Sequence, residues 1–162
     1  MKNRIQAGFT MVELIVVIVI LGILAAVALP KFMGLEKEAR IAALKSMGGT
    51  LQSAAQMAHG VCMAQNCGTA ATIITINGAP VTFTNTYPNA ASIASLVQST
   101  EGFTVVGSTF TKTGATAATC RVIYNAATLA AGVVTPPTLT YNATVMSSGT
   151  EGAINLNLRT VC

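Results

Sequence analysis

One long apolar run near the N-terminus constrains this chain more than any other feature. Residues 9–29 are 21 residues with a single charge, Glu13. A membrane-spanning helix needs about 20 predominantly apolar residues, so this run is long enough to cross a bilayer. Lys2 and Arg4 precede it, and basic residues on that side favour a cytoplasmic N-terminus. The sequence contains no second run of this kind, which excludes a polytopic membrane protein.

A conventional secretory signal peptide is the alternative interpretation of the same segment. Residues 14–29 would form its apolar core, and Ala26–Ala28 offers a small-x-small cleavage site. This core lies at the long limit of the usual range of about 7–15 residues. Glu13 would also carry an insertion cost of about 2.5–3.5 kcal/mol for no purpose in a disposable segment. This alternative predicts cleavage after Ala28 and a soluble secreted enzyme or binding module.

The composition beyond residue 45 favours β-structure and excludes several classes of function. Residues 46–162 carry five charges, and 20 of the 22 threonines lie between Thr69 and Thr160. Threonine packs well on a pleated sheet. Basic residues are too sparse here for specific nucleic-acid binding. With no Asp and five Glu, a carboxylate cage for calcium or magnesium is not expected. We expect no cofactor.

The segment between the apolar run and the β-region predicts an amphipathic helix over residues 31–62. Apolar side chains recur there at spacings of three and four and form one face: Ile41, Leu44, Met47, Leu51, Ala54, Ala58 and Val61. Gly48-Gly49 interrupts this pattern, either as a soft point or as a close packing contact.

The region after Gly60 predicts short strands separated by turns. Asn77-Gly78 indicates a hairpin, for which we expect a loop extended by Ala79-Pro80. Asn89 is a candidate N-cap for a short helix over 90–98. Further strands are predicted at 103–106, 119–124, 139–146 and 154–158. The order of elements predicts an α+β fold, in which a long N-terminal helix packs against an antiparallel β-sheet head.

The residues around the start of the apolar run resemble a known family signature. Gly8-Phe9-Thr10-Met11-Val12-Glu13, followed by about twenty apolar residues, resembles the class III signal of type IV pilins. The resemblance implies that a prepilin peptidase cuts between Gly8 and Phe9 and methylates the new N-terminus of Phe9. It also implies that Glu13 pairs with the N-terminal amine of a neighbouring subunit. Gly22 and Pro30 match positions where pilin helices are kinked or locally melted.

This resemblance implies a division of the chain and a function. Residues 1–8 would be the leader, 9–30 the transmembrane and filament-core helix, 31–62 the amphipathic helix and 63–162 the head. The expected function is that of a structural, non-enzymatic subunit of a type IVa pilus. It would wait in the inner membrane and then homopolymerise, with the help of assembly machinery, into a surface filament for attachment, biofilm formation or motility. Tyr87-Pro88 and the segment Cys120–Tyr124 are similar to mannose-sensitive haemagglutinin pilins.

Four cysteines follow the apolar run, at positions 62, 67, 120 and 162, outside the cytoplasm in the expected topology. An even number in an oxidising compartment favours disulfides, and three pairings are possible. We favour Cys62–Cys67, which closes a small loop, and Cys120–Cys162, because a disulfide-bounded C-terminal region resembles type IVa pilins. The alternative is a zinc site, for which Cys-x4-Cys is poor spacing. His59 is the one histidine, and we expect it to be structural rather than catalytic or metal-ligating.

Two related functions stay open at this stage. A pseudopilin of a type II secretion system shares the N-terminal motif, but major pseudopilins hold calcium in a carboxylate-bearing C-terminal loop. The absence of Asp and the presence of four cysteines disfavour it. A minor pilin is the other alternative, although the intact Glu13 and the modest size suit a major one.

Overall fold

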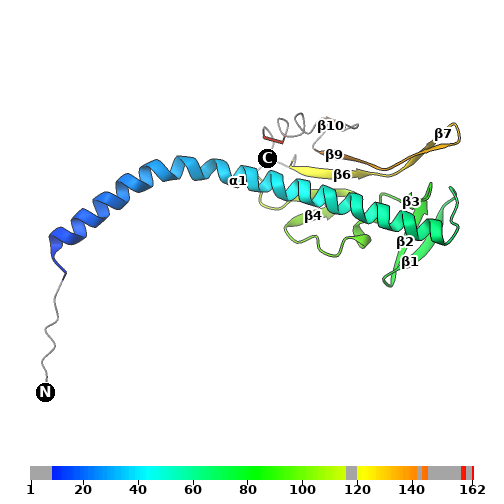
Figure 1. Ribbon diagram of the computed structural model, residues 1–162, viewed down its shortest axis with the longest axis horizontal. Coiled ribbons are helices and arrows are strands. Elements are labelled where there is room, and N and C mark those ends of the chain that lie inside the picture. The colour runs from blue at the N-terminus through cyan, green and yellow to red at the C-terminus, as the bar shows by residue number, and fades with distance from the viewer. Residues whose placement is uncertain (1–8, 116–119, 142–143, 146–157, 160–161) are drawn as a thin grey trace, which may run out of the picture. The chain divides into compact units, whose positions relative to one another are not determined.

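The computed structural model describes residues 9–115, 120–141, 144–145, 158–159 and 162 (Figure 1). It separates into two compact units, Met1–Lys37 and Glu38–Cys162. The helix α1 (Met11–Ala64) contributes its first part to one unit and its last part to the other. The structure confirms the expected pilin-like α+β fold, which consists of a long N-terminal helix and antiparallel sheets.

The first unit is an uncovered apolar helix. All of its large apolar side chains that the structure describes are exposed. The first of them, Phe9, is 83% exposed, and the last, Leu35, is 57% exposed. The helix runs without interruption through Gly22 and Pro30, although proline removes one backbone hydrogen bond. A role for these two residues as weak points during assembly stays a prediction.

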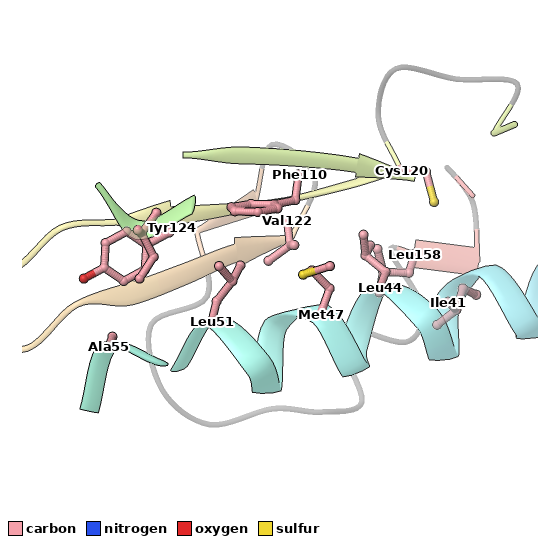
Figure 2. Packing of buried hydrophobic residues seen from close by; sticks show 11 residues of the cluster. Ile41, Leu44, Met47, Leu51, Ala55, Phe110, Cys120, Val122, Tyr124 and Leu158 are labelled. Atoms are coloured by element: carbon pink, nitrogen blue, oxygen red, sulfur yellow. The ribbon is translucent and has the colours of Figure 1, made fainter. Parts of the chain in front are cut away.

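The last part of α1 is amphipathic, as the sequence predicted. The expected face is buried from Ile41 to Ala58, with Val61 half-buried, and Ala55 and Cys62 join it. Figure 1 shows this part of α1 running alongside the strands of the head. Figure 2 shows its side chains meeting those of the sheet: Leu44, Met47 and Leu51 face Phe110, Val122 and Tyr124.

The strands that the structure describes form three antiparallel sheets. The first has the order β1-β2-β3, from Thr72–Ile76, Ala79–Thr84 and Tyr87–Pro88. The second has the order β10-β9-β6-β5-β4, from Thr144–Val145, Thr138–Tyr141, Arg121–Asn125, Thr109–Lys112 and Phe103–Val106. The third pairs β7 (Thr128–Ala130) with β8 (Val133–Thr135).

Two local predictions were wrong. The β1–β2 loop has two residues, because Ile76 pairs with Ala79 and Thr75 with Pro80. Asn77 and Gly78 both have positive φ, 50° and 81°, as a tight type I′ turn requires. Pro80 fits in β2 because β3 pairs only with Phe83 and Thr84, which leaves Pro80 with one neighbouring strand.

The helix expected over 90–98 is only a short 3₁₀ turn, η1 (Ile93–Leu96), with Ser92 at the N-cap position but without a side-chain capping bond. Asn89 instead accepts a hydrogen bond from the Ser92 amide through Oδ1 at 2.9 Å. Ser92 Oγ accepts one from the Thr82 amide, and Ser95 Oγ donates to the Ser92 carbonyl. The bonds of Asn89 and Ser95 are local, whereas the bond to Thr82 joins Ser92 to β2, and both kinds compete with an α-helix.

The other predicted strands agree with the structure to different extents. The segment predicted at 103–106 is β4 and has the same bounds. The one predicted at 119–124 corresponds to β6, and the one at 139–146 corresponds to β9 and β10. Residues 119, 142–143 and 146 lie outside the described residues. Of the strand expected at 154–158, residues 154–157 lie outside the described residues and Leu158 is helical.

Gly48 is required by a close approach between α1 and β9. A Cβ atom there would collide with the Tyr141 hydroxyl and lie 2.8 Å from its Cζ, whereas a Cβ at Gly49 would meet nothing within 4 Å. Of the two interpretations of Gly48-Gly49, the packing contact therefore holds for Gly48.

We expect Gly48→Ala and Gly49→Ala to differ in effect although they are neighbours on one helix. Both gain helix propensity, about 1 kcal/mol for Ala over Gly. Only Gly48→Ala overpacks the contact with Tyr141, which costs about 1–3 kcal/mol. The unfolding free energy of Gly48→Ala should therefore be lower than that of Gly49→Ala by this amount. Urea unfolding of the detergent-solubilised chain measures it. Adding Tyr141→Phe should recover part of the loss, and equal midpoints for the two glycine variants would refute the contact.

Tyr124 joins the two larger sheets. Its ring is 1% exposed, and its hydroxyl donates a 2.9 Å hydrogen bond to the carbonyl of Pro88 in β3. We expect Tyr124→Phe to reduce the unfolding free energy by about 1–3 kcal/mol, because a buried carbonyl is left without its donor. Urea unfolding checks this, and a midpoint equal to that of the unmodified chain would show that the bond contributes nothing.

The same residue makes the head sensitive to alkali. Burial raises the pKa of Tyr124 above its ordinary value of 10, and burial also raises the pKa of Tyr141. The folded state therefore favours the neutral phenols. Their contribution to stability is complete below the unfolded pKa and is lost as the pH rises above about 10. The urea midpoint should fall from pH 9 to pH 11, and Tyr124→Phe should flatten this fall. A urea midpoint that stays constant between pH 9 and pH 11 would contradict the expected loss of stability.

Candidate assembly site

The start of α1 is closed by a reciprocal pair of side chains. Thr10 precedes the first helical residue, and its Oγ1 accepts a hydrogen bond from the Glu13 amide at 3.2 Å. Glu13 Oε2 in turn accepts bonds from the Thr10 amide at 3.0 Å and from the Thr10 hydroxyl at 2.7 Å. This is a capping box, which satisfies amide groups that otherwise have no partner in the first turn.

Glu13 therefore has a hydrogen-bonding partner on its own chain before any neighbour is present. Thr10 supplies dipoles and no charge, so the carboxylate keeps its negative charge. The Thr10 amide belongs to the Phe9–Thr10 peptide and would survive cleavage before Phe9. Phe9 itself is exposed, and Gly8 lies outside the described residues.

The helix that follows is the one described helix long and apolar enough to span a bilayer. None of its most apolar window is buried. A signal sequence near an N-terminus has the same length and apolar composition. Within this apolar window the exposed surface continues around all sides of the helix, so lipid or other helices must shield it from water.

A second group of candidate residues, the cysteines, lies in the head. The structure joins Cys62 to Cys67 and Cys120 to Cys162, with Cα atoms 5.2 Å and 4.9 Å apart. Both Cys62 and Cys120 are fully buried. Cys120 immediately precedes β6, so the second bond attaches Cys162 at the edge of the main core, close to the buried Leu158.

The short disulfide coincides with the end of α1. The Cys67 amide donates to the Cys62 carbonyl at 3.0 Å, and the Asn66 amide donates to the Met63 carbonyl at 3.2 Å. Asn66 has a φ of 52°. This is a Schellman motif, in which the residues at the positions of Cys62 and Cys67 are normally in apolar contact. The Cys-x4-Cys spacing thus follows from helix-ending geometry.

The remaining candidate, His59, packs within the head. Its ring stacks on Tyr87 with centroids 4.1 Å apart and an interplanar angle of 5°. Its Nδ1 lies 2.9 Å from the Thr86 carbonyl, to which it donates. Among the residues that the structure describes, no group of three His, Cys, Asp or Glu side chains could hold a metal ion.

Sequence reasoning missed two residues of importance. Thr10 could have been found, because Thr-x-x-Glu directly before an apolar run is the signature of a capping box. Tyr141 gave no local signal, since its partner Gly48 is distant in the sequence.

Comparison with known proteins finds a family motif near the N-terminus of the chain. Residues 3–29 match the prokaryotic N-terminal methylation motif. The chain is similar to the type II secretion system core protein G of Pseudomonas aeruginosa PAO1, with 47% identity over 45 residues, 28% of this chain and 32% of that protein. It is also similar to the protein of the same name from Aeromonas hydrophila, with 54% identity over 39 residues, 24% of this chain and 27% of that protein.

These similarities cover a limited part of each molecule. The chain spans about a third or less of the length of these curated relatives. No solved structure matches it significantly. The chain is a prepilin-like structural protein with an N-methylation motif, not an enzyme, and it is distantly related over part of its length to a type II secretion core protein. The motif implies processing by prepilin peptidase and assembly into pilus-like polymers.

Proposed function

We propose that this chain is a structural subunit of a type IV pilus, cleaved between Gly8 and Phe9 and methylated on Phe9. The observation that carries the proposal is the contrast between the two units. The head has its own buried core, whereas the apolar helix before it has no side chain of its most hydrophobic window covered. A single chain of this kind needs lipid or other copies of the same helix around it.

The proposed mechanism is a transfer of the helix between these two surroundings. In the inner membrane, lipid covers the helix over 9–30, with the N-terminus in the cytoplasm. In the filament, the helices of neighbouring subunits replace the lipid, and the assembly machinery drives the transfer. Gly22 and Pro30 then act as the points where the helix adapts to its neighbours.

Glu13 determines the axial position at which a subunit docks in the filament. After cleavage, Phe9 carries a cationic amine one turn before Glu13. The Thr10 bonds hold the Glu13 carboxylate in the free subunit, and the amine of an adjacent subunit neutralises its charge in the filament. Because an unpaired charge is costly in apolar surroundings, the subunit that docks at the correct height is favoured.

The head supplies the outer surface of the filament. We propose that the bonds Cys62–Cys67 and Cys120–Cys162 form outside the cytoplasm and protect the head there. The similarity of Tyr87-Pro88 and of Cys120–Tyr124 to mannose-sensitive haemagglutinin pilins supports a role in attachment or biofilm formation.

Deletion of the gene in its native host tests the proposal. Surface filaments should disappear from electron micrographs and from the sheared fraction, and the unmodified gene should restore both. Antibodies to the head should label the filaments along their length if the chain is the major subunit. Filaments that persist without the chain would contradict this role, and labelling at rare points would indicate a minor pilin.

A second candidate function, a pseudopilus subunit of a type II secretion system, is favoured by the names of the two curated relatives. The sequence contains no Asp and has four cysteines, which disfavours the calcium-holding loop of that class. The same deletion strain separates the two functions. Loss of export of folded proteins with surface filaments intact would support the pseudopilus.

A further inference from the structure

The head contains an open groove with a neutral lining. This α1–β1 groove lies between the last part of α1 and the β1–β2 turn, has a volume of about 1010 Å³, and is lined by Ser53, Met57, Val61, Ile76 and Leu96 among others. None of its lining residues is charged. Met57 on its wall is 74% exposed. Serine, threonine, asparagine and glutamine side chains supply its polar groups.

The same head carries an apolar projection that it does not bury. In the β7–β8 hairpin, Leu129 is 47% exposed and Val133 is 67% exposed. Leu129 pairs with Val134 on one face, which is apolar. Ala130 pairs with Val133 on the other face, which also carries the pair of Thr128 and Thr135. Residues 126–139 contain no charge.

The tip of this hairpin is narrow and preformed. Ala130 and Val133 pair directly, which leaves a two-residue turn of Ala131 and Gly132 with φ of 50° and 79°. A type I′ turn of this kind fixes the twist of the two strands. A preformed element loses little conformational freedom when it binds.

We propose that the β7–β8 hairpin of one subunit docks in the α1–β1 groove of a neighbouring copy of the same chain. This inference deepens the proposed function and rests on it. The two surfaces match in chemistry, because both are apolar with neutral hydrogen-bonding groups and neither carries a charge. A second copy is favoured over a small molecule because it covers the exposed hairpin as well as the groove.

The geometry of such a contact suits a filament. A hairpin that enters a different surface of the next copy is a heterologous contact, and each copy keeps one free hairpin and one free groove. Contacts of this type continue into open polymers unless the rotation closes a ring. A contact of groove with groove would instead stop at a dimer.

Cysteine cross-linking in filaments of the full-length chain tests this proposal. Met57→Cys and Val133→Cys are combined in one chain, and sheared filaments are treated with a short bismaleimide. The matched control replaces Met57→Cys with Gln56→Cys, on the neighbouring exposed residue outside the groove lining. The thioether products survive reduction, so a reducing gel excludes links through the native disulfides.

The proposal predicts a ladder of dimers, trimers and larger products for the Met57/Val133 pair, and monomer for the Gln56/Val133 pair and each single variant. The ladder should be equally strong in low and high salt, because no charge is involved. Filaments that contain the chain but give no ladder would overturn the docking contact and leave the pilus function standing. A dimer from Met57→Cys alone, or a product with a different protein, would also overturn it. Absence of the unmodified chain from filaments would refute the proposed function, and the docking contact with it.

Discussion

Glu13→Ala should leave cleavage after Gly8 intact and abolish nearly all surface filaments. The amine of Phe9 would then enter the apolar filament core without its partner, at about 2.5–3.5 kcal/mol for one charge in such surroundings. Since 1.4 kcal/mol corresponds to a factor of ten in an equilibrium constant, the amount of assembled subunit should fall by about 100-fold. Quantifying the subunit in the sheared fraction, relative to the processed subunit in the membrane, measures the effect.

The capping box allows the charge of Glu13 to be separated from its hydrogen bonds. Glu13→Gln keeps a side chain that suits the capping position but removes the charge, so it should assemble as poorly as Glu13→Ala. Thr10→Ala keeps the charge and removes the Thr10 hydroxyl from the box. It should cost about 0.5–2 kcal/mol of helix stability and spare most filaments. Normal piliation of Glu13→Gln would exclude charge pairing as the basis of assembly.

The second large effect is expected from the disulfides. The double variant Cys120→Ala/Cys162→Ala removes a disulfide between residues 42 apart in the sequence. The double variant Cys62→Ala/Cys67→Ala removes one between residues 5 apart. Loop-closure entropy gives about 4 kcal/mol for the first bond and about 2 kcal/mol for the second. The hydrogen bonds of the Schellman motif stay available in the second variant, so α1 should still end at the same residue.

Urea unfolding of the two double variants in detergent measures this difference. The Cys120/Cys162 variant should unfold at the lower urea concentration and expose Leu158, which is buried beside that bond. Limited proteolysis should cut the C-terminal region of this variant first. Equal midpoints, or a larger loss for the Cys62/Cys67 variant, would contradict the assigned roles.

The sequence predicted best where the signals are local. The apolar run and the period of the following helix located α1, because both patterns follow from helix geometry within a few turns. Asn77-Gly78 marked the β1–β2 turn correctly, and only the predicted loop length was wrong, because Pro80 pairs with Thr75 in the strand. The β7–β8 hairpin was missed because its turn is Ala131-Gly132, a weaker signal than Asn-Gly.

Contacts between distant residues could not be predicted in the same way. From the sequence alone, Gly48 is equally consistent with a weak point of the helix and with a packing contact. The position of Tyr141 in the structure decides between the two. The helix expected over 90–98 failed because Ser92 bonds to Thr82 in β2, a tertiary contact that no helical pattern reveals. At the candidate assembly site, the sequence motif pointed to Glu13, whereas the hydrogen bonds show that Thr10 is its partner.

Intact-mass spectrometry of material sheared from the cell surface, with and without reductant, tests the central claim most directly. The account predicts a chain that starts at Phe9 and is one methyl group heavier than the unmodified peptide. Without reductant this chain should be four hydrogens lighter than its reduced form, as two disulfides require. A chain that starts at Leu29 and is found only in the soluble fraction would contradict the account.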